Sequence, residues 1–294
     1  MLLALKIDVG SCLATRDGLP RLVEVLQRHG CGATFSLSLG QDRSGRAWLT
    51  GRDPAGRFGL QGFASRGWGN WLPAPEIGVR GFEVLRAAHN AGFEMILQGW
   101  DRYRWLRDIG QADQSRIASE YDTARRRFAQ LFGAAPAAHA APDCRAGRSL
   151  FRLDQRYGLS YASHCRGRHP FWPVVDGEPV RCPQLPVTLP SLLELLQSGA
   201  QPDAAAERLI HLSASPEPHG HVYNGDAAVD GGRYLAQFDR MLSGWRERGY
   251  KLVDLATLRR QLNLAVLPYH SIDVRPDGSR LPPQYWQGEA FPSL

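Results

Sequence analysis

The first nine residues constrain the fold more than any other stretch of the chain. The run Leu2–Val9 is apolar except at Lys6 and Asp8. Continuous apolar character over the length of one strand is typical of a strand buried on both faces of a parallel sheet. The carboxyl ends of parallel strands meet at one edge of the sheet, where α/β proteins usually place their chemistry. Asp8 is therefore the first candidate catalytic residue.

Helical and strand-like segments alternate after this run. Over Arg16–Gly30 the apolar residues lie on one helical face, Pro20 fits the first turn and Gly30 ends the pattern. A strand over Cys31–Leu39 completes a βαβ unit, which predicts a parallel sheet. The further predicted strands are Phe93–Leu97, Ala137–Ala141, Ser160–Ser163, Arg208–Leu212 and Lys251–Asp254, and the further predicted helices are Val79–Ala91, Ser115–Phe132, Ser149–Tyr157, Leu192–Leu196 and Gly232–Gly249.

Two segments depart from this alternation. Residues 41–77 are rich in Gly, Arg and Trp and show no sustained period, so we expect an insertion or lid within a single domain over residues 1–264. Its aromatic and arginine side chains would suit a membrane interface or a lipid carrier, although they could equally pack a satellite core. Residues 265–294 are Pro-rich and polar, and we expect a C-terminal tail packed on the outside of the barrel.

Composition excludes several classes of protein. A chain of 294 residues with 43% hydrophobic and 22% charged residues is typical of a globular domain. No apolar run approaches the roughly 20 residues that span a bilayer, and the N-terminus lacks the basic region of a signal peptide, so we expect a cytoplasmic protein. The five cysteines (Cys12, Cys31, Cys144, Cys165 and Cys182) are odd in number and irregularly spaced, which favours reduced thiols. The net charge of +6 is scattered, which argues against nucleic-acid binding but would suit an anionic substrate or membrane surface.

The stretch from Lys6 to Gly40, "KIDVGSCLATRDGLPRLVEVLQRHGCGATFSLSLG", resembles the start of the polysaccharide deacetylase (NodB-homology) superfamily. It is most similar to the branch that deformylates the aminoarabinose lipid 4-deoxy-4-formamido-L-arabinose-phosphoundecaprenol. The resemblance implies a distorted (β/α) barrel of α/β class. In that branch the first strand carries Asp-x-Asp, in which the first Asp is the general base and the second binds a divalent metal. Asp8 matches the base, whereas Gly10 stands at the metal position.

The other two metal positions are altered as well. The superfamily holds its metal on Asp-His-His, and the two His come from His-x-x-x-His. The matching stretch here is "EMILQGWDRYRW", with Gln98 and Arg102 at the ligand positions. Arginine has no lone pair to offer a metal, and an amide oxygen is a weak, neutral ligand. The resemblance therefore predicts that Gly10, Gln98 and Arg102 form a degenerate site that holds no metal, and we expect no cofactor there.

The remaining motifs match those of the superfamily more closely. "HAAPDCRAG" keeps Pro142 and Arg145, and the resemblance implies that Arg145 orients Asp8; "LIHLSAS" places His211 at the position of the general acid. "YASHCRGRHPFWPV" and "CPQLPVTLPSLLELL" resemble the walls of the substrate groove. The residues that the resemblance implies for substrate binding are Trp100, Pro142, Arg166 and Phe171.

A relocated metal site is an alternative. Several residues at or near the motif positions could ligate zinc, cobalt or manganese: Cys12, Asp143, Cys144, His164 and Cys165. His219 and His221 are also metal-competent, but they lie in a Pro/Gly-rich stretch that rarely presents a preformed site. No two members of the first set share a helix at i and i+4, so the sequence alone does not show that they converge.

Three hypotheses about function follow. In the first, the protein is a pseudo-deacetylase that binds an acylated amino sugar, free or lipid-linked, or assists an active paralogue, at the cytoplasmic face of the inner membrane. In the second, it is an active deacetylase or deformylase that hydrolyses a C–N amide bond without metal or with a relocated one, using Asp8 and His211 with Arg102 in place of the cation. In the third, the resemblance is one of fold alone and a different small molecule is bound.

Overall fold

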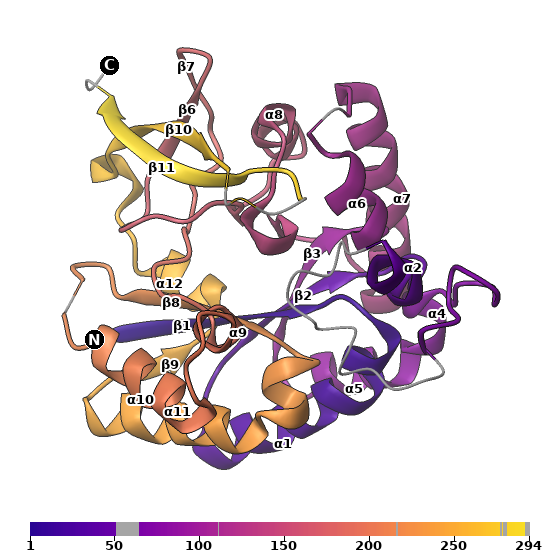
Figure 1. Ribbon diagram of the computed structural model, residues 1–294. Coiled ribbons are helices and arrows are strands. Elements are labelled where there is room, and N and C mark those ends of the chain that lie inside the picture. The colour runs from indigo at the N-terminus through magenta and orange to yellow at the C-terminus, as the bar shows by residue number, and fades with distance from the viewer. Residues whose placement is uncertain (51–64, 111, 216, 277, 279–280, 292–294) are drawn as a thin grey trace.

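The computed structural model describes residues 1–50, 65–110, 112–215, 217–276, 278 and 281–291 (Figure 1). Its centre is a seven-stranded parallel sheet in the order β5-β4-β3-β2-β1-β8, with β9 also paired with β1. The strands of this sheet are β1 (Leu2–Val9), β2 (Thr34–Ser38), β3 (Glu94–Gly99), β4 (Ala138–Ala140), β5 (Tyr161–Ser163), β8 (His221–Asp226) and β9 (Lys251–Val253).

The sheet is strongly curled. In a flat sheet β1 and β5 would lie roughly 19 Å apart, because neighbouring strands are about 4.8 Å apart and three strands separate them. Lys6 of β1 is nevertheless fully buried, with its Nζ 3.3 Å from Oγ of Ser163 on β5. This contact across the interior requires the sheet to curve into a distorted barrel, so the predicted fold class is confirmed.

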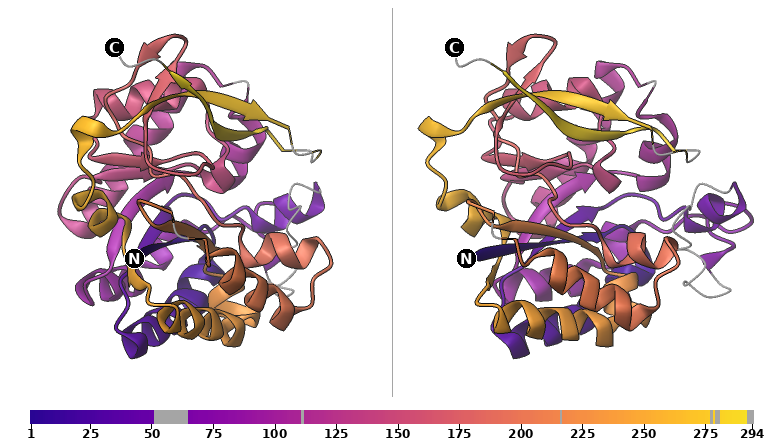
Figure 2. Two further views of the ribbon diagram at one scale, coloured as in Figure 1. Left: turned by 90° about the vertical axis from the view of Figure 1, so that its left-hand side faces the viewer. Right: turned by 60° about the vertical axis from the view of Figure 1, so that its left-hand side comes forward.

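Helices cover the outside of the curled sheet. In Figure 2, α1 and α11 lie on one side of the strands and the C-terminal hairpin lies on the other. The helices are α1 (Leu19–His29), α2 (Ser44–Leu49), α4 (Ile77–Arg80), α5 (Phe82–Asn90), α6 (Arg102–Asp108), α7 (Gln114–Phe132), α8 (Arg148–Arg156), α9 (Leu192–Gln197), α10 (Pro202–Leu212), α11 (Leu235–Glu247) and α12 (Leu255–Arg260). Most of their buried apolar residues join those of the strands in one large core, whereas Leu255 and Leu258 of α12 belong to a second, smaller cluster. Within the described ranges no helix combines the length and the apolar character needed to cross a membrane.

A second sheet closes the other side of the molecule. Its order is β11-β10-β6-β7, from β6 (Trp172–Val175), β7 (Glu178–Pro179), β10 (Tyr269–Arg275) and β11 (Gln284–Phe291). The C-terminal segment that we expected to be a packed tail thus contributes two strands, and β10 pairs in parallel with β6. The alternating pattern of this segment is weak, because these strands are only partly buried.

One predicted strand is wrong. Arg208–Leu212 forms the last turns of α10, which begins at Pro202 and runs through "DAAAERLIHL", a sequence of good helix formers. The Pro/Gly-rich stretch around His221 instead contains a strand, β8, which pairs in parallel with β1. Several other predicted strands and helices, among them those at β1, β2, β3, α1, α7 and α11, are present with shifted ends.

The insertion over residues 41–77 has closely spaced ends. Gln41 forms an antiparallel bridge with Glu76, and the Asp42 amide donates to the Pro75 carbonyl at 2.7 Å. The insertion contains α2, and its residues 51–64 lie outside the described part of the chain. It is therefore an excursion from the carboxyl end of β2 that returns to its starting point.

Candidate functional site

Asp8 lies at the carboxyl edge of the sheet, as its place near the end of the apolar run Leu2–Val9 predicts. It is only 1% exposed, and its Cα is in register with Ser36 on β2 and Asp226 on β8. The Ser36 hydroxyl donates to Asp8 Oδ1 at 2.6 Å. The neighbouring strands therefore fix the carboxylate in one orientation.

Arg102 is the positive partner of this carboxylate. It is the first residue of α6, which is capped by Asp101, and it is only 5% exposed. Its Nη1 lies 3.4 Å from Asp8 Oδ2, and its Nη2 donates to Asp143 Oδ1 at 2.9 Å. One guanidinium thus links two carboxylates in a buried network, in the fork geometry that Arg provides.

Gln98 and Gly10 complete the network. Gln98 Oε1 accepts from Arg102 Nη1 at 3.0 Å and from Ser38 Oγ at 2.9 Å. A Cβ atom on Gly10 would lie 2.8 Å from Cδ of Arg102, closer than such atoms approach one another. Gly10 therefore provides the space that the arginine side chain fills.

The structure thus brings Gly10, Gln98 and Arg102 together, but these residues do not fit the divalent metal that the resemblance implies. Gly10 offers no ligand, the Gln98 oxygen already accepts two hydrogen bonds, and Arg102 places a fixed positive charge beside Asp8. A cation next to a guanidinium would be repelled, and an arginine donates no lone pair.

Asp143 lies in a turn with unusual backbone geometry. Asp143 and Cys144 have φ values of 53° and 56°, in the left-handed region that costs a residue other than glycine roughly 1–3 kcal/mol. In the Ala-Pro-Gly-Trp-Arg segment that "HAAPDCRAG" resembles, glycine stands at position 143, and glycine adopts this conformation easily. The ion pair with Arg102 helps to compensate for the strain, so the aspartate here is coupled to the change at position 102.

Two further aspartates were missed in the sequence. Asp226 ends β8 next to Asp8, and its backbone amide donates to Asp230 Oδ2 at 2.8 Å. Asp230 is buried and also accepts from the Tyr223 hydroxyl at 2.6 Å; burial raises its pKa to about 6. A prediction that placed a strand at β8 would have put Asp226 at the same sheet edge as Asp8. Asp230 would then follow in the turn directly after that strand.

His211 does not have the predicted position, and Arg145 contacts the C-terminal segment. His211 lies exposed in the last turn of α10, on the outer helical layer, so the acid–base pair with Asp8 is not formed. Arg145 donates to the Pro282 carbonyl of the C-terminal segment, and Arg102 lies within ion-pair distance of Asp8. The helical position of His211 separates it from Asp8, whereas the predicted role of Arg145 in orienting Asp8 stays a prediction.

The predicted substrate-binding residues differ in exposure. Arg166 bonds to Glu194 at 2.6 Å and stacks over the Trp286 ring at 5.3 Å. Phe171 is fully buried and Pro142 is buried, so both support the wall from behind. Trp100 is partly exposed, and its carbonyl accepts from the amide of Gly40, the residue just before the insertion, at 2.7 Å. Their role in substrate binding stays a prediction.

The residues proposed for a relocated metal do not converge as one set. In the described part of the chain, one group of His, Cys, Asp and Glu side chains could hold a metal ion, and it consists of His139, Asp154 and His164. Only His164 belongs to the predicted set. Of the other metal-competent residues, His221 is engaged by Thr188 at 3.1 Å and by the Ser215 carbonyl at 2.9 Å.

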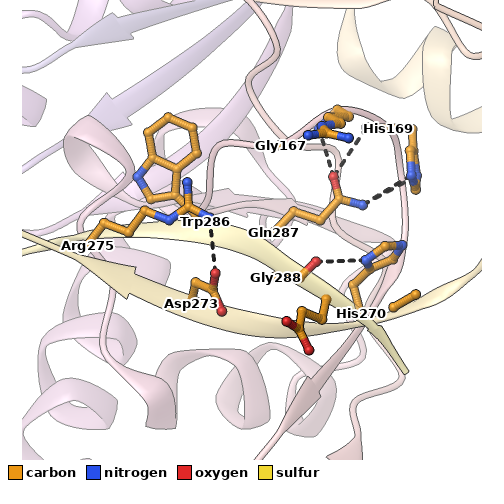
Figure 3. Close-up of a pocket in the computed structure, with 11 residues that line it drawn as sticks. Gly167, His169, His270, Asp273, Arg275, Trp286, Gln287 and Gly288 are labelled. Carbon is orange, nitrogen blue, oxygen red and sulfur yellow. Dashed lines mark hydrogen bonds and ion pairs between the residues drawn. The ribbon is translucent and has the colours of Figure 1, made fainter. Parts of the chain in front are cut away.

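A separate pocket lies on the four-stranded sheet (Figure 3). Its volume is about 560 Å³, and it is lined by residues of β10, β11 and the 167–169 loop. The imidazoles of His169 and His270 meet edge to face at 5.1 Å, and Gln287 accepts from the backbone of Arg168 at 2.7 Å. Because the polar groups bond mainly to each other, we assign the pocket no ligand.

Comparisons with known proteins agree with this fold. A probable 4-deoxy-4-formamido-L-arabinose-phosphoundecaprenol deformylase from Shewanella sediminis is 29% identical over 269 residues, which cover 86% of this chain and 84% of that protein. A polysaccharide deacetylase structure from Mycobacterium smegmatis covers 88% of both chains with 14% identity and a TM-score of 0.62. A CE4 family pseudoenzyme from Bacillus anthracis covers 92% of this chain and 69% of its own, with 13% identity and a TM-score of 0.55.

No family model matches the chain. The expected resemblance to polysaccharide deacetylases, and to the aminoarabinose-lipid deformylases among them, is nevertheless confirmed by these comparisons.

Proposed function

Because the chain is similar to aminoarabinose-lipid deformylases over most of its length, we propose that it binds an acylated amino sugar, free or lipid-linked, without hydrolysing it. The observation that carries this proposal is the Arg102 network. An arginine fills the position where the resemblance implies a metal, and it is paired with the retained Asp8 and with Asp143.

Hydrolysis of an amide needs an activated water, a base and an acid for the leaving amine. Asp8 could accept a proton, but it is held by Ser36 and Arg102, and the guanidinium occupies the position where the resemblance implies a Lewis acid. His211, the predicted acid, lies on the outer surface of α10. These three features favour binding over turnover.

The same residues suit recognition of an amide. A guanidinium donates to a carbonyl oxygen, and a carboxylate accepts from an N–H or a sugar hydroxyl. Arg102 and Asp8 hold this donor–acceptor pair at the sheet edge, where they are 5% and 1% exposed, and Asp226 adds a carboxylate on the next strand. A bound amide would therefore replace part of the contact between Arg102 and Asp8. A formamido or acetamido sugar offers the complementary groups.

The runner-up is an active hydrolase without metal at this site. Arg102 could stabilise an oxyanion and Asp8 could act as base, since the two lie 3.4 Å apart. The buried His139–Asp154–His164 group does not help this hypothesis, because all three side chains are inaccessible to a substrate.

We extend the proposal to the site of action. Trp48, Leu49, Trp71 and Leu72 of the insertion are exposed apolar residues, and Trp71 is 78% exposed. Such side chains next to arginines suit the surface of an anionic membrane, where a lipid-linked sugar would be presented. An active deacetylase paralogue that receives the bound sugar is the further partner that we propose.

The test is to measure binding and turnover on one ligand. We would titrate the full-length protein with a formamidoarabinose phosphate carrying a short polyprenyl chain, and assay formate release by mass spectrometry. We expect saturable binding without formate. An Arg102→Ala variant should bind at least about tenfold more weakly, as loss of a charged hydrogen bond predicts. Arg104→Ala, on the same helix but about half exposed, serves as the control.

Each other outcome contradicts the proposal in a different way. Formate release that is lost in Asp8→Asn would establish the metal-free hydrolase instead. Failure of formylated and acetylated amino sugars to bind would favour a different ligand on the same fold.

A further inference from the structure

A second polar cluster lies in the core behind the Asp8 site. His139 is on β4, Asp154 is on α8 and His164 follows β5, and all three are fully buried. His139 Nδ1 lies 3.1 Å from Asp154 Oδ1, and His164 Nε2 contacts the other carboxylate oxygen. One potential ligand atom from each residue lies within 4.8 Å of the others.

The surroundings of His139 are those of a metal ligand. Its second ring nitrogen, Nε2, faces the backbone carbonyl of Gln98 at 3.4 Å. Ligating histidines usually donate their other N–H to a carbonyl or carboxylate, which fixes the ring and the tautomer. The Gln98 carbonyl therefore leaves Nδ1 free to point a lone pair at the centre of the cluster.

The cluster also contains polar atoms that its hydrogen bonds leave unsatisfied. His164 Nδ1 and the Tyr121 hydroxyl are buried and have no hydrogen-bond partner. The Tyr121 ring lies 4.8 Å from that of His139, so the hydroxyl belongs to the same region. Buried polar groups are nearly always paired, and two unpaired ones beside a candidate ligand set need an explanation.

The charge of the buried Asp154 carboxylate also favours a bound cation. A carboxylate in the protein interior requires a compensating cation close by. A divalent ion would supply the charge and would also offer a fourth coordination position in the cluster.

We propose that His139, Asp154 and His164 hold a divalent transition-metal ion, with zinc as the best match, in a structural site. Two imidazoles and one carboxylate are a three-ligand donor set known for zinc, in which water or another oxygen takes the fourth position. The separation of 3.1 Å between His139 Nδ1 and Asp154 Oδ1 is close to the roughly 3.3 Å expected between ligands of tetrahedral zinc. Complete burial excludes a substrate, so the ion ties β4, β5 and α8 together. The inference does not depend on the proposed function.

The experiment uses the untagged full-length protein. It would be purified from zinc-supplemented cells, dialysed against a weak chelator and analysed by elemental mass spectrometry; a second sample would be unfolded, stripped and refolded with cobalt for absorption spectra. We expect about one zinc ion per chain and a tetrahedral cobalt spectrum. Asp154→Asn and His139→Gln should reduce the zinc content at least about tenfold.

The controls separate this site from the others. His169→Gln removes an imidazole outside the cluster, and Asp8→Asn alters the sheet-edge site; both should keep the zinc. Less than about 0.1 zinc per chain in the wild type, with no cobalt spectrum after refolding, would overturn the proposal. Zinc that survives Asp154→Asn but is lost in Asp8→Asn would also overturn it. If the cluster variants do not fold, the wild-type metal content and spectrum still decide.

Discussion

Arg102 connects the altered positions of the site into one unit. Its side chain fills the space that Gly10 leaves open and donates a hydrogen bond to Gln98. It also forms ion pairs with Asp8 and Asp143. A change at one of these positions therefore depends on the others. This coupling makes two predictions at the level of single residues.

The first concerns stability. Arg102→Met should lower the free energy of unfolding by about 3–5 kcal/mol, because it leaves the buried Asp8 and the partly buried Asp143 without their cation. Urea unfolding would measure the loss. Arg104→Met is the matched control, since Arg104 lies on the same helix, is about half exposed and reaches Asp101 only at 3.7 Å; we expect a change within about 0.5 kcal/mol. Equal effects of the two variants would show that the Arg102 network is not stabilising.

The second prediction concerns restoring the metal ligands that the resemblance implies. Gly10→Asp alone should destabilise the protein, because the new Cβ meets Arg102, whereas Gly10→Asp with Gln98→His and Arg102→His should create a site for zinc or cobalt. Calorimetric titration of the triple variant with cobalt measures the outcome. To separate this site from the buried cluster, the titration would be repeated with Asp154→Asn added. A triple variant that gains no metal site would show that the ligand positions are wrongly assigned.

At the scale of elements, the turn after β8 contains a second buried acid. Asp230 accepts hydrogen bonds from the Tyr223 hydroxyl and the Asp226 amide, and burial raises its pKa to about 6 from 3.8. A carboxyl whose folded pKa is raised favours the folded state most when protonated. Its contribution is complete below about pH 4 and is lost as the pH rises through about 6.

This shift gives a measurable pH dependence. The difference in unfolding free energy between wild type and Asp230→Asn should fall by up to about 3 kcal/mol between pH 4 and pH 7, with the wild type losing stability relative to the variant. Urea unfolding at several pH values measures it. Asp203→Asn, at an exposed site, should show no such trend. A difference that stays constant with pH would mean that Asp230 ionises normally.

The elements also show what the sequence can predict. Buried strands such as β1 and capped amphipathic helices such as α1 follow from local pattern, and so does the place of Asp8 at a strand end. β8 was missed because its residues "HVYNGD" follow a Pro/Gly-rich stretch, and α10 was misread because "RLIHL" is apolar enough for a strand. Ion pairs such as Arg102 with Asp143 depend on loops that meet only in three dimensions, so no local pattern predicts them.

At the scale of the whole molecule, four of the nine large apolar residues that are exposed in the described part of the chain lie in one segment. In the described part of the chain, large exposed apolar residues include Trp48, Leu49, Trp71 and Leu72, which all belong to the insertion that leaves the sheet edge after β2. This edge also carries Asp8. Membrane contact through the insertion would therefore present the site to a sugar at the lipid surface.

This arrangement predicts that the insertion determines membrane binding. Trp71→Ser combined with Leu72→Ser should lower the partition coefficient onto vesicles of anionic phospholipid at least about tenfold, since each apolar side chain contributes roughly 1.5–3 kcal/mol when buried. Cosedimentation at low and physiological salt measures the loss. Val266→Ser, which removes a side chain that is 70% exposed outside the insertion, is the control and should bind as the wild type does. Equal binding of all three proteins would assign any membrane contact to another surface and would leave the bound sugar to be delivered in soluble form.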